Sequence, residues 1–101
     1  MRHHKAALVR HDKVLLKNGV IVEAKIWRVL VSDKYPDGLR YSLFGIHPDG
    51  RVLVGYDNHY PKGHHRHLGD AQESYAFTDL EKLRDDFKAD LESEMAKRGL
   101  T

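Results

Sequence analysis

The fold of this chain is decided by the stretch KNGVIVEAKI, which runs from Lys17 to Ile26. Asn18-Gly19 supplies the two positive-φ positions that a type I′ hairpin turn requires, and apolar and polar side chains alternate after it. Because successive side chains of a strand point to opposite faces, the apolar positions share one face. These positions are Val20, Val22, Ala24 and Ile26, with Glu23 and Lys25 on the other face. The stretch therefore predicts an antiparallel hairpin with one face against a core.

On both sides of this hairpin turn the chain consists of short β-like runs separated by turn sequences. Pro36-Asp37-Gly38 and Pro48-Asp49-Gly50 are typical of turns, and apolar residues follow each of them. We predict four strands, which cover roughly residues 6–16, 20–31, 39–47 and 51–57. The short connections favour an antiparallel meander, since parallel pairing requires long crossovers.

A helix is predicted over residues 79–98. Thr78 and Glu81 fit a capping box at its start, and Gly99 is a natural stop. An apolar stripe steps through the segment by three or four residues, and it consists of Leu80, Leu83, Phe87, Leu91 and Met95. Because this stripe needs an apolar surface, we expect the helix to pack across one face of the sheet. The predicted fold class is α+β: one domain over residues 1–101, with a four-stranded antiparallel meander and one C-terminal helix.

Length and composition limit the classes of protein to which this chain can belong. The chain has 101 residues, of which 41% are hydrophobic, and a net charge of +2. A domain of this size stays marginally stable, which leaves room for a homodimer or another bound partner. The sequence has no cysteine, no apolar run of the roughly 20 residues that span a bilayer and no secretory signal, so we expect a cytoplasmic protein without membrane contact.

The segment YDNHYPKGHHRH, residues 56–67, carries the functional signal. It contains four of the chain's eight histidines, and we expect residues 58–70 to form a functional loop after the last strand. Histidine exchanges protons near neutral pH, and lysine and arginine supply fixed positive charge. This combination favours metal-independent cleavage of RNA, with His65 and His67 as acid and base and with Lys62 and Arg66 on the phosphate. No metal or other cofactor is expected.

Three simpler interpretations of the same segment compete with catalysis. A basic loop holds phosphates without breaking them. A solvent-exposed histidine-rich turn has no function of its own. A metal site is the third, because His65 and His67 on a strand would share one side of a sheet, as in cupin-type sites. The metal interpretation is the weakest of these from sequence, since Glu73 comes late for such a pattern and no histidine follows His67.

Several motifs together resemble the TumE family, small bacterial and archaeal proteins assigned as toxins of toxin–antitoxin pairs. The motifs are Tyr56-Asp57-Asn58, Lys62-Gly63, His65-Arg66-His67 and Tyr75-x-Phe77-Thr78, supported by Val22-Glu23 and Ile26-Trp27-Arg28. The resemblance covers most of the chain. It implies a growth-inhibiting toxin that acts on RNA and is encoded beside an antitoxin with a DNA-binding domain.

The resemblance also implies a set of functional residues. To the catalytic candidates His65, His67, Lys62 and Arg66 it adds a substrate-binding group, which consists of Tyr56, Asp57 and Asn58, and we add His64 to that group. His64 stands where the family pattern has a variable, often acidic residue, so it brings one more imidazole. The alternative function is a non-catalytic module that binds nucleic acid or a partner through the same basic loop.

Overall fold

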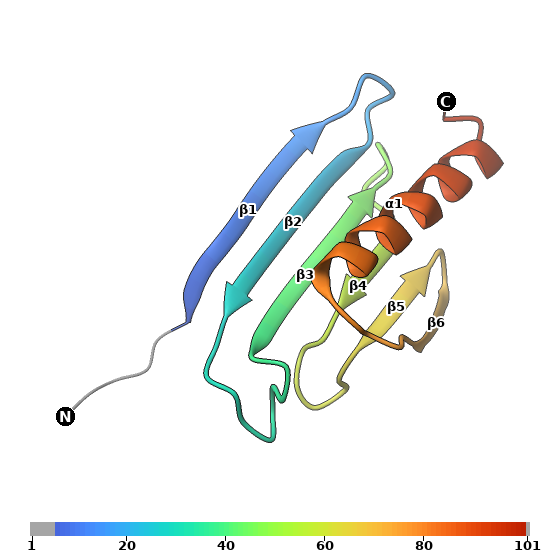
Figure 1. Cartoon of the computed structure of the whole chain (residues 1–101). Coiled ribbons are helices and arrows are strands. Elements are labelled where there is room, and N and C mark those ends of the chain that lie inside the picture. Colours follow the sequence, from blue (N-terminus) through green and yellow to red (C-terminus); the bar gives the residue numbers. More distant parts are fainter. Residues whose placement is uncertain (1–5, 101) are drawn as a thin grey trace.

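The computed structural model describes residues 6–100, which form one sheet and one helix (Figure 1). The strands pair in the order β1-β2-β3-β4-β5-β6, and every pair is antiparallel. Their bounds are β1 Ala7–Leu15, β2 Ile21–Arg28, β3 Leu39–Ile46, β4 Val52–Asp57, β5 His65–Leu68 and β6 Ala71–Ser74, and the helix α1 is Leu80–Lys97. The α+β class and the antiparallel meander with a C-terminal helix are confirmed.

The prediction of four strands is wrong, because residues 6–100 contain six. The segment 58–70, expected to be a loop, holds β5 and the turn into β6. Gly69 takes a positive φ of 60° in that turn, which closes the β5–β6 hairpin. This hairpin has polar side chains on both faces, so the apolar alternation that identifies a strand in a sequence is missing from it.

The first hairpin forms as predicted, but its turn is of another type. Gly19 has a positive φ of 89°, whereas no residue other than glycine has one between residues 6 and 100, so the turn lacks the second positive-φ residue of type I′. Asn18 contributes through its side chain instead. Its amide oxygen accepts from the backbone N–H of Val20 at 3.0 Å, and its amide nitrogen donates to the carbonyl of Leu100. Asn18 thereby ties the turn to the end of the chain.

The helix begins one residue later than the capping box suggests. Asp79, not Thr78, is the N-cap, because its carboxylate accepts from the backbone N–H of Lys82 at 2.8 Å. The helix ends at Lys97 with Arg98 as its C-cap, and the positive φ of 69° at Gly99 confirms the predicted stop just beyond it. Three residues of the predicted stripe, Leu83, Phe87 and Leu91, are buried against the sheet.

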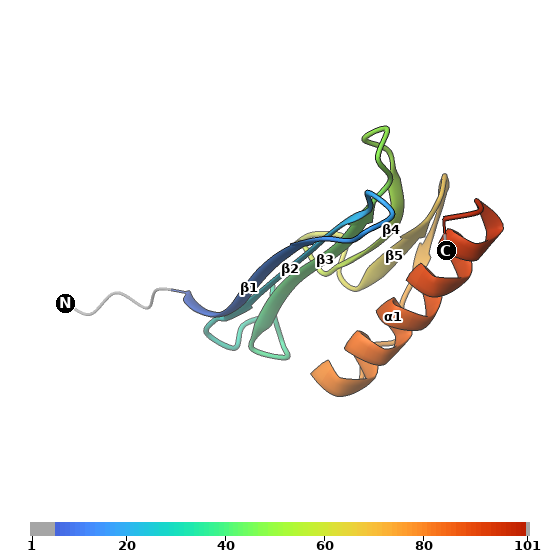
Figure 2. The ribbon, with the colours of Figure 1, turned by 90° about the horizontal axis from the view of Figure 1, so that it is seen from above.

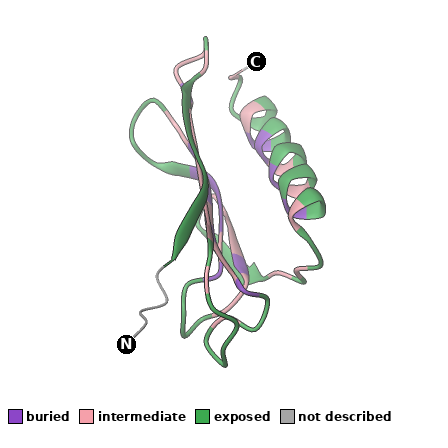
Figure 3. Cartoon of the chain, turned by 60° about the vertical axis from the view of Figure 1, so that its left-hand side comes forward, coloured by how far each residue is buried: buried purple, intermediate pink, exposed green. Residues whose placement is uncertain are grey.

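The core lies between α1 and one face of the sheet, and the opposite face carries no second layer from residues 6–100 (Figures 2 and 3). Its buried members are Val20, Tyr41, Leu43, Leu53, Val54, Tyr56, Leu83, Phe87 and Leu91. The helix approaches closely at Gly45, where a β-carbon would lie 2.5 Å from a methyl group of Leu91. We call the two sides of the sheet the helix-covered face and the open face.

The helix covers only part of the sheet. β1 is exposed along its whole length and lies beyond the helix at one edge (Figure 1). Within residues 6–100, no helix combines the length and the apolar character that a membrane span requires.

Candidate functional site

Strand alternation divides the motif of residues 56–67 between the two faces of the sheet. Tyr56 and Arg66 are directly opposite each other on β4 and β5, and both reach Asp90 of α1. Their neighbours Asp57, His65 and His67 must then point to the open face. The sequence suggested one loop that could surround a single phosphate, but Arg66 lies on the other side of the sheet from His65 and His67.

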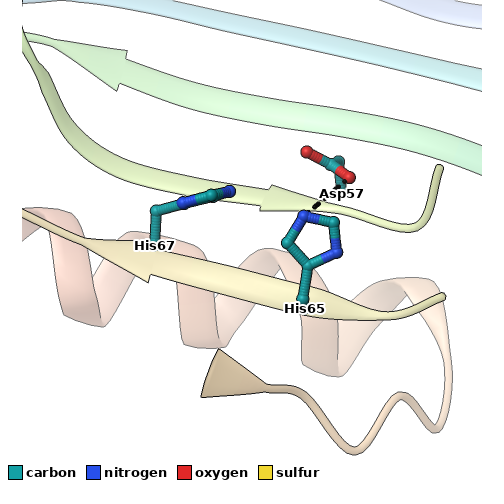
Figure 4. Close-up of side chains that lie close together, drawn as sticks. All are labelled: Asp57, His65 and His67. Carbon is teal, nitrogen blue, oxygen red and sulfur yellow. Dashed lines mark ion pairs between the residues drawn. The ribbon is translucent and has the colours of Figure 1, made fainter. Parts of the chain in front are cut away.

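The side chains of Asp57, His65 and His67 come together on the open face, and we call them the open-face cluster (Figure 4). One potential ligand atom from each residue lies within 4.8 Å of the other two. The imidazole Nε2 of His65 is 3.1 Å from the Asp57 carboxylate, and the two imidazole rings meet edge to face with centroids 5.1 Å apart. Two imidazoles and a carboxylate are groups that transfer protons or bind transition metals.

Pairing of β4 with β5 sets the geometry of this cluster. Asp57 pairs with His65, and Gly55 pairs with His67, so all three cluster residues project from neighbouring positions of a rigid ladder. The ring of Phe44 lies over Gly55, where a β-carbon would approach it to 2.3 Å. Phe44 also contacts His67, with centroids 6.5 Å apart. Glycine at position 55 thus makes room for an aromatic wall beside His67.

His65 is held at both of its ring nitrogens. Nδ1 lies 2.8 Å from the carbonyl oxygen of Gly63, and Nε2 faces Asp57. Its side chain is only 8% exposed. Because a carbonyl oxygen accepts hydrogen bonds and cannot donate them, Nδ1 must carry a hydrogen. The orientation of the ring is therefore fixed.

His67 is the less constrained of the two histidines. Its ring nitrogens have no hydrogen-bond partner among residues 6–100, and its side chain is partly exposed. Burial lowers the pKa of His67, and the neighbouring His65 ring and the Lys62 ammonium lower it further, against the opposite effect of Asp57. The imidazole is accordingly neutral near pH 7 and keeps one nitrogen free to accept a proton or a metal ion.

Lys62 adds a positive charge beside the cluster. It lies on the loop between β4 and β5 and borders a pocket of about 400 Å³ that His65 and Ser74 also line. Within residues 6–100, no carboxylate forms an ion pair with Lys62. The ammonium group is therefore available to an anion that enters this pocket.

Arg66 belongs to a closed network on the helix-covered face. Its guanidinium donates to Glu73 at 2.8 and 3.0 Å, to Asp90 at 3.1 Å and to the hydroxyl of Tyr56 at 3.2 Å. Tyr56 in turn donates to Asp90. Burial raises the pKa of Tyr56 to about 12, and its hydrogen bond to Asp90 contributes in the same direction. These contacts connect β4, β5, β6 and α1.

Asn58 and His64, predicted to bind substrate, are both engaged within the fold. The amide of Asn58 accepts from the backbone N–H of Tyr41 at 2.9 Å and donates to the carbonyl of Leu39 at 2.8 Å, which pins the start of β3. His64 bonds the hydroxyl of Tyr41 at 2.8 Å and the carboxylate of Asp37 at 2.7 Å. Both polar side chains therefore connect β3 and its preceding loop to the motif.

A comparison with protein-family models shows to which family this chain belongs. The model described as Toxin TumE matches residues 3–95 of the 101 residues. The chain belongs to the TumE family. It is therefore a toxin of a toxin–antitoxin system, and membership implies a cognate antitoxin. Neither the curated proteins nor the solved structures that were searched contain a match.

In this TumE-family chain, sequence reasoning missed partners on both faces. Asp90 and Glu73 hold Arg66, yet one lies on the helix and the other on an unpredicted strand. Phe44 reaches His67 from β3. These partners come from separate elements, so no short sequence motif predicts that they contact the site. The polar pattern of residues 65–74 was the one available signal, because a strand with polar residues on both faces often lies beside a site.

The open face of this TumE-family chain also carries cations and aromatic rings beyond the cluster. Register places Trp27 of β2 opposite Arg40 of β3, and Lys25 opposite Ser42, which in turn pairs with Asp57. Tyr41 and Leu43 are buried in the core, so their strand neighbours Arg40 and Ser42 face the open side. The cluster therefore lies at one end of a surface that offers both positive charge and aromatic area.

Proposed function

We propose that this TumE-family toxin cleaves RNA at the open-face cluster. The observation that carries the proposal is the convergence of Asp57, His65 and His67 beside Lys62 on the face that α1 does not cover. Imidazole and carboxylate groups move protons or bind metals, and an adjacent cation stabilises charge on a phosphate. A toxin that inhibits growth by attacking RNA needs these groups at a solvent-accessible surface.

The surroundings of the cluster favour single-stranded RNA as the ligand. Trp27 and Phe44 offer aromatic surface on which bases stack, and Lys25 and Arg40 supply positive charge for the backbone. Stacking and cationic contacts along a sheet are the usual means by which proteins bind unpaired RNA. A strand of RNA that crosses β2 and β3 would bring one phosphate to Lys62 and His67.

The geometry changes the roles that the sequence suggested for the basic residues. A pair of histidines that act as acid and base needs a free nitrogen on each ring, and of His65 and His67 only His67 offers one. Arg66 faces α1, so its role in the proposal is to position β5, not to contact the phosphate. Lys62 keeps its proposed role as the phosphate-binding cation.

Cleavage is tested with the purified full-length toxin and a fluorescently labelled single-stranded RNA. We expect His67→Ala to lower the cleavage rate by about 100-fold or more, because acid–base or metal-assisted steps are typically worth that much. His59→Ala is the matched control, since His59 is exposed on the neighbouring loop and its ring forms no hydrogen bond or ion pair with residues 6–100. Equal rates for the two variants would contradict the proposal.

A binding module that holds RNA without breaking it is the second candidate. The observation in its favour is that both nitrogens of His65 are engaged, which leaves a cluster with a single free imidazole. Filter binding or fluorescence anisotropy separates the two functions. A catalytic cluster predicts that His67→Ala still binds the RNA within a few-fold of the wild type, whereas a pure binder would show tight binding and no cleavage in any preparation.

We further propose that the cognate antitoxin carries a DNA-binding domain, as in the family pattern. The test is the reading frame beside the toxin gene, which should encode a short protein with such a domain. A homodimer of the toxin is a separate proposal, suggested by the small size of the chain. Light scattering of the purified toxin at several concentrations gives its mass in solution, and a monomer throughout would exclude the dimer.

A further inference from the structure

We propose that Asp57, His65 and His67 form a binding site for one divalent transition-metal ion. The three residues belong to two adjacent strands, with His65 and His67 two positions apart on β5 and Asp57 directly opposite His65 on β4. All three side chains therefore leave the same face of a rigid ladder. Two imidazoles and one carboxylate form a ligand set that binds first-row transition metals.

The distances within the cluster suit a metal ion after a small adjustment. Ligand atoms at about 2.0–2.1 Å from a tetrahedral Zn²⁺ ion lie about 3.4 Å from one another. The potential ligand atoms of the three residues lie within 4.8 Å of one another, and Nε2 of His65 and Oδ1 of Asp57 are 3.1 Å apart. The set closes around an ion if the partly exposed His67 ring moves toward the other two ligands.

The hydrogen bond at Nδ1 of His65 fixes the direction of its other ring nitrogen. Nδ1 lies 2.8 Å from the carbonyl oxygen of Gly63, so Nε2 points at the carboxylate of Asp57, 3.1 Å away. Both side chains are largely buried, with 8% and 17% exposed. The fold therefore holds an imidazole nitrogen and a carboxylate oxygen side by side as two potential metal ligands.

A metal ion accounts for more of the geometry than a proton does. A proton on Nε2 would satisfy His65 and Asp57 but would leave the proximity of His67 unexplained. The carbonyl of Gly63 that holds Nδ1 is the kind of outer partner that orients metal-binding histidines in other proteins. The backbone N–H of His59 donates to Asp57 at 3.2 Å and holds the carboxylate in the same way.

The ligand set also indicates the class of metal. Imidazole nitrogen suits Zn²⁺ and its neighbours in the first transition row, whereas Mg²⁺ and Ca²⁺ prefer oxygen ligands alone. Three protein ligands leave a further coordination position for water or substrate, and His65 also lines the pocket beside Lys62. A metal ion with an open coordination position can polarise a phosphoryl oxygen. Only this catalytic role of the metal rests on the proposed RNA cleavage; the binding of the metal does not.

Binding is tested by titrating the metal-free, full-length toxin with Zn²⁺ in a calorimeter and with Co²⁺ by visible absorption. His3 and His4 are also adjacent imidazoles, so every protein carries His3→Ala and His4→Ala as a common background. We expect one ion per chain. Asp57→Asn and His67→Ala should each weaken binding by about 10-fold or more, whereas His59→Ala should leave it unchanged.

Asp57→Asn guards against loss of folding, because it keeps the size and hydrogen-bonding capacity of the side chain and removes only its charge. Zn²⁺ should raise the Tm of the background protein and leave that of Asp57→Asn nearly unchanged. Absence of binding, or equal affinity in Asp57→Asn, His67→Ala and the background, would overturn the site and leave a simple ion pair between His65 and Asp57.

The outcomes also separate this inference from the proposed function. Stoichiometric binding that depends on Asp57 and His67, without RNA cleavage, supports the metal site and contradicts the ribonuclease. RNA cleavage that persists after complete metal removal, together with no Zn²⁺ binding, supports the ribonuclease and overturns the metal site. Cleavage that is lost with chelation and restored by Zn²⁺ in the background protein but not in Asp57→Asn supports both.

Discussion

The two faces of the sheet differ in how far their polar side chains are already satisfied. On the helix-covered face, Arg66, Tyr56 and Asp90 bond one another and leave little capacity for a ligand. On the open face, His67 and Lys62 have no such partners among residues 6–100. Tyr56, Arg66 and His67 come from the same short motif, and they differ in the face of the sheet to which their strands direct them.

This difference shows that residues adjacent in the sequence need not have side chains in the same site. Arg66 lies between His65 and His67 in the chain, yet the sheet separates its side chain from both. We infer that the helix-covered face maintains stability and that the open face carries the chemistry. If so, substitutions on the first face should alter unfolding and spare cleavage, and substitutions on the second should do the opposite.

The largest expected effect is on the helix-covered face, at Leu83. This side chain is 1% exposed, so Leu83→Ala leaves a cavity between α1 and the sheet and should lower the free energy of unfolding by about 2–5 kcal/mol. Urea denaturation measures the change, and Lys88→Ala on the exposed side of the helix is the control, with a change within about 0.5 kcal/mol. Cleavage per folded molecule should not change.

Tyr56 gives the next test, by its response to alkaline pH. Burial and the hydrogen bond to Asp90 raise its pKa to about 12, so the folded state retains the phenol proton that the unfolded chain loses above its ordinary value of 10.0. Its contribution to stability is therefore complete below pH 10 and is lost as pH rises toward 12. Absorbance at 295 nm follows the ionisation, and Tyr56→Phe should lose the delayed component near pH 12 while those of Tyr41 and Tyr75, whose pKa values burial also raises, remain.

A smaller loss of stability is expected at Arg66. Arg66→Met keeps much of the side-chain length but leaves Asp90 and Glu73 without their guanidinium partner, which should cost about 1–2 kcal/mol because the network is partly exposed. Denaturation gives the stability, and the RNA assay should give the rate of the wild type under conditions where the variant is folded. A rate as low as that of His67→Ala would break the division between the faces.

The smallest effect is expected at Lys62 on the open face. Lys62→Gln removes one phosphate contact, so the slope of log affinity for single-stranded RNA against log salt should fall by about 0.7, with affinity reduced several-fold. Stability should stay within about 0.5 kcal/mol of the wild type, because Lys62 forms no ion pair within residues 6–100. A large stability loss would show that this lysine serves the fold.

Much of the architecture could be predicted from local patterns. The alternation after Asn18-Gly19 predicted β2, and the apolar stripe of α1 predicted three of its buried residues, Leu83, Phe87 and Leu91. β5 and β6 could not be found in this way, because side chains on both of their faces are polar for different reasons. The helix-covered side of this hairpin is polar because Arg66 and Glu73 pair there, and the open side because it carries His65 and His67.

The metal interpretation shows a second limit of the sequence. A third ligand was sought after His65-x-His67, where Glu73 comes late, but the carboxylate that meets the two rings is Asp57, which precedes them. An antiparallel neighbour places an earlier residue opposite a later one, and the distance along the chain depends on the loop length. Without knowledge that β4 pairs with β5, no spacing rule selects Asp57.

The sequence by itself determined the antiparallel order of β1 to β4, the helix with its stop signal at Gly99, and which reactive side chains residues 56–67 contain. It could do so because periodicity, glycine conformation and side-chain chemistry are local properties. The tertiary structure alone decided which of those groups meet. The packing of α1 on one face assigned Arg66 to the network beneath the helix and exposed His67, since a strand must direct neighbouring side chains to opposite sides.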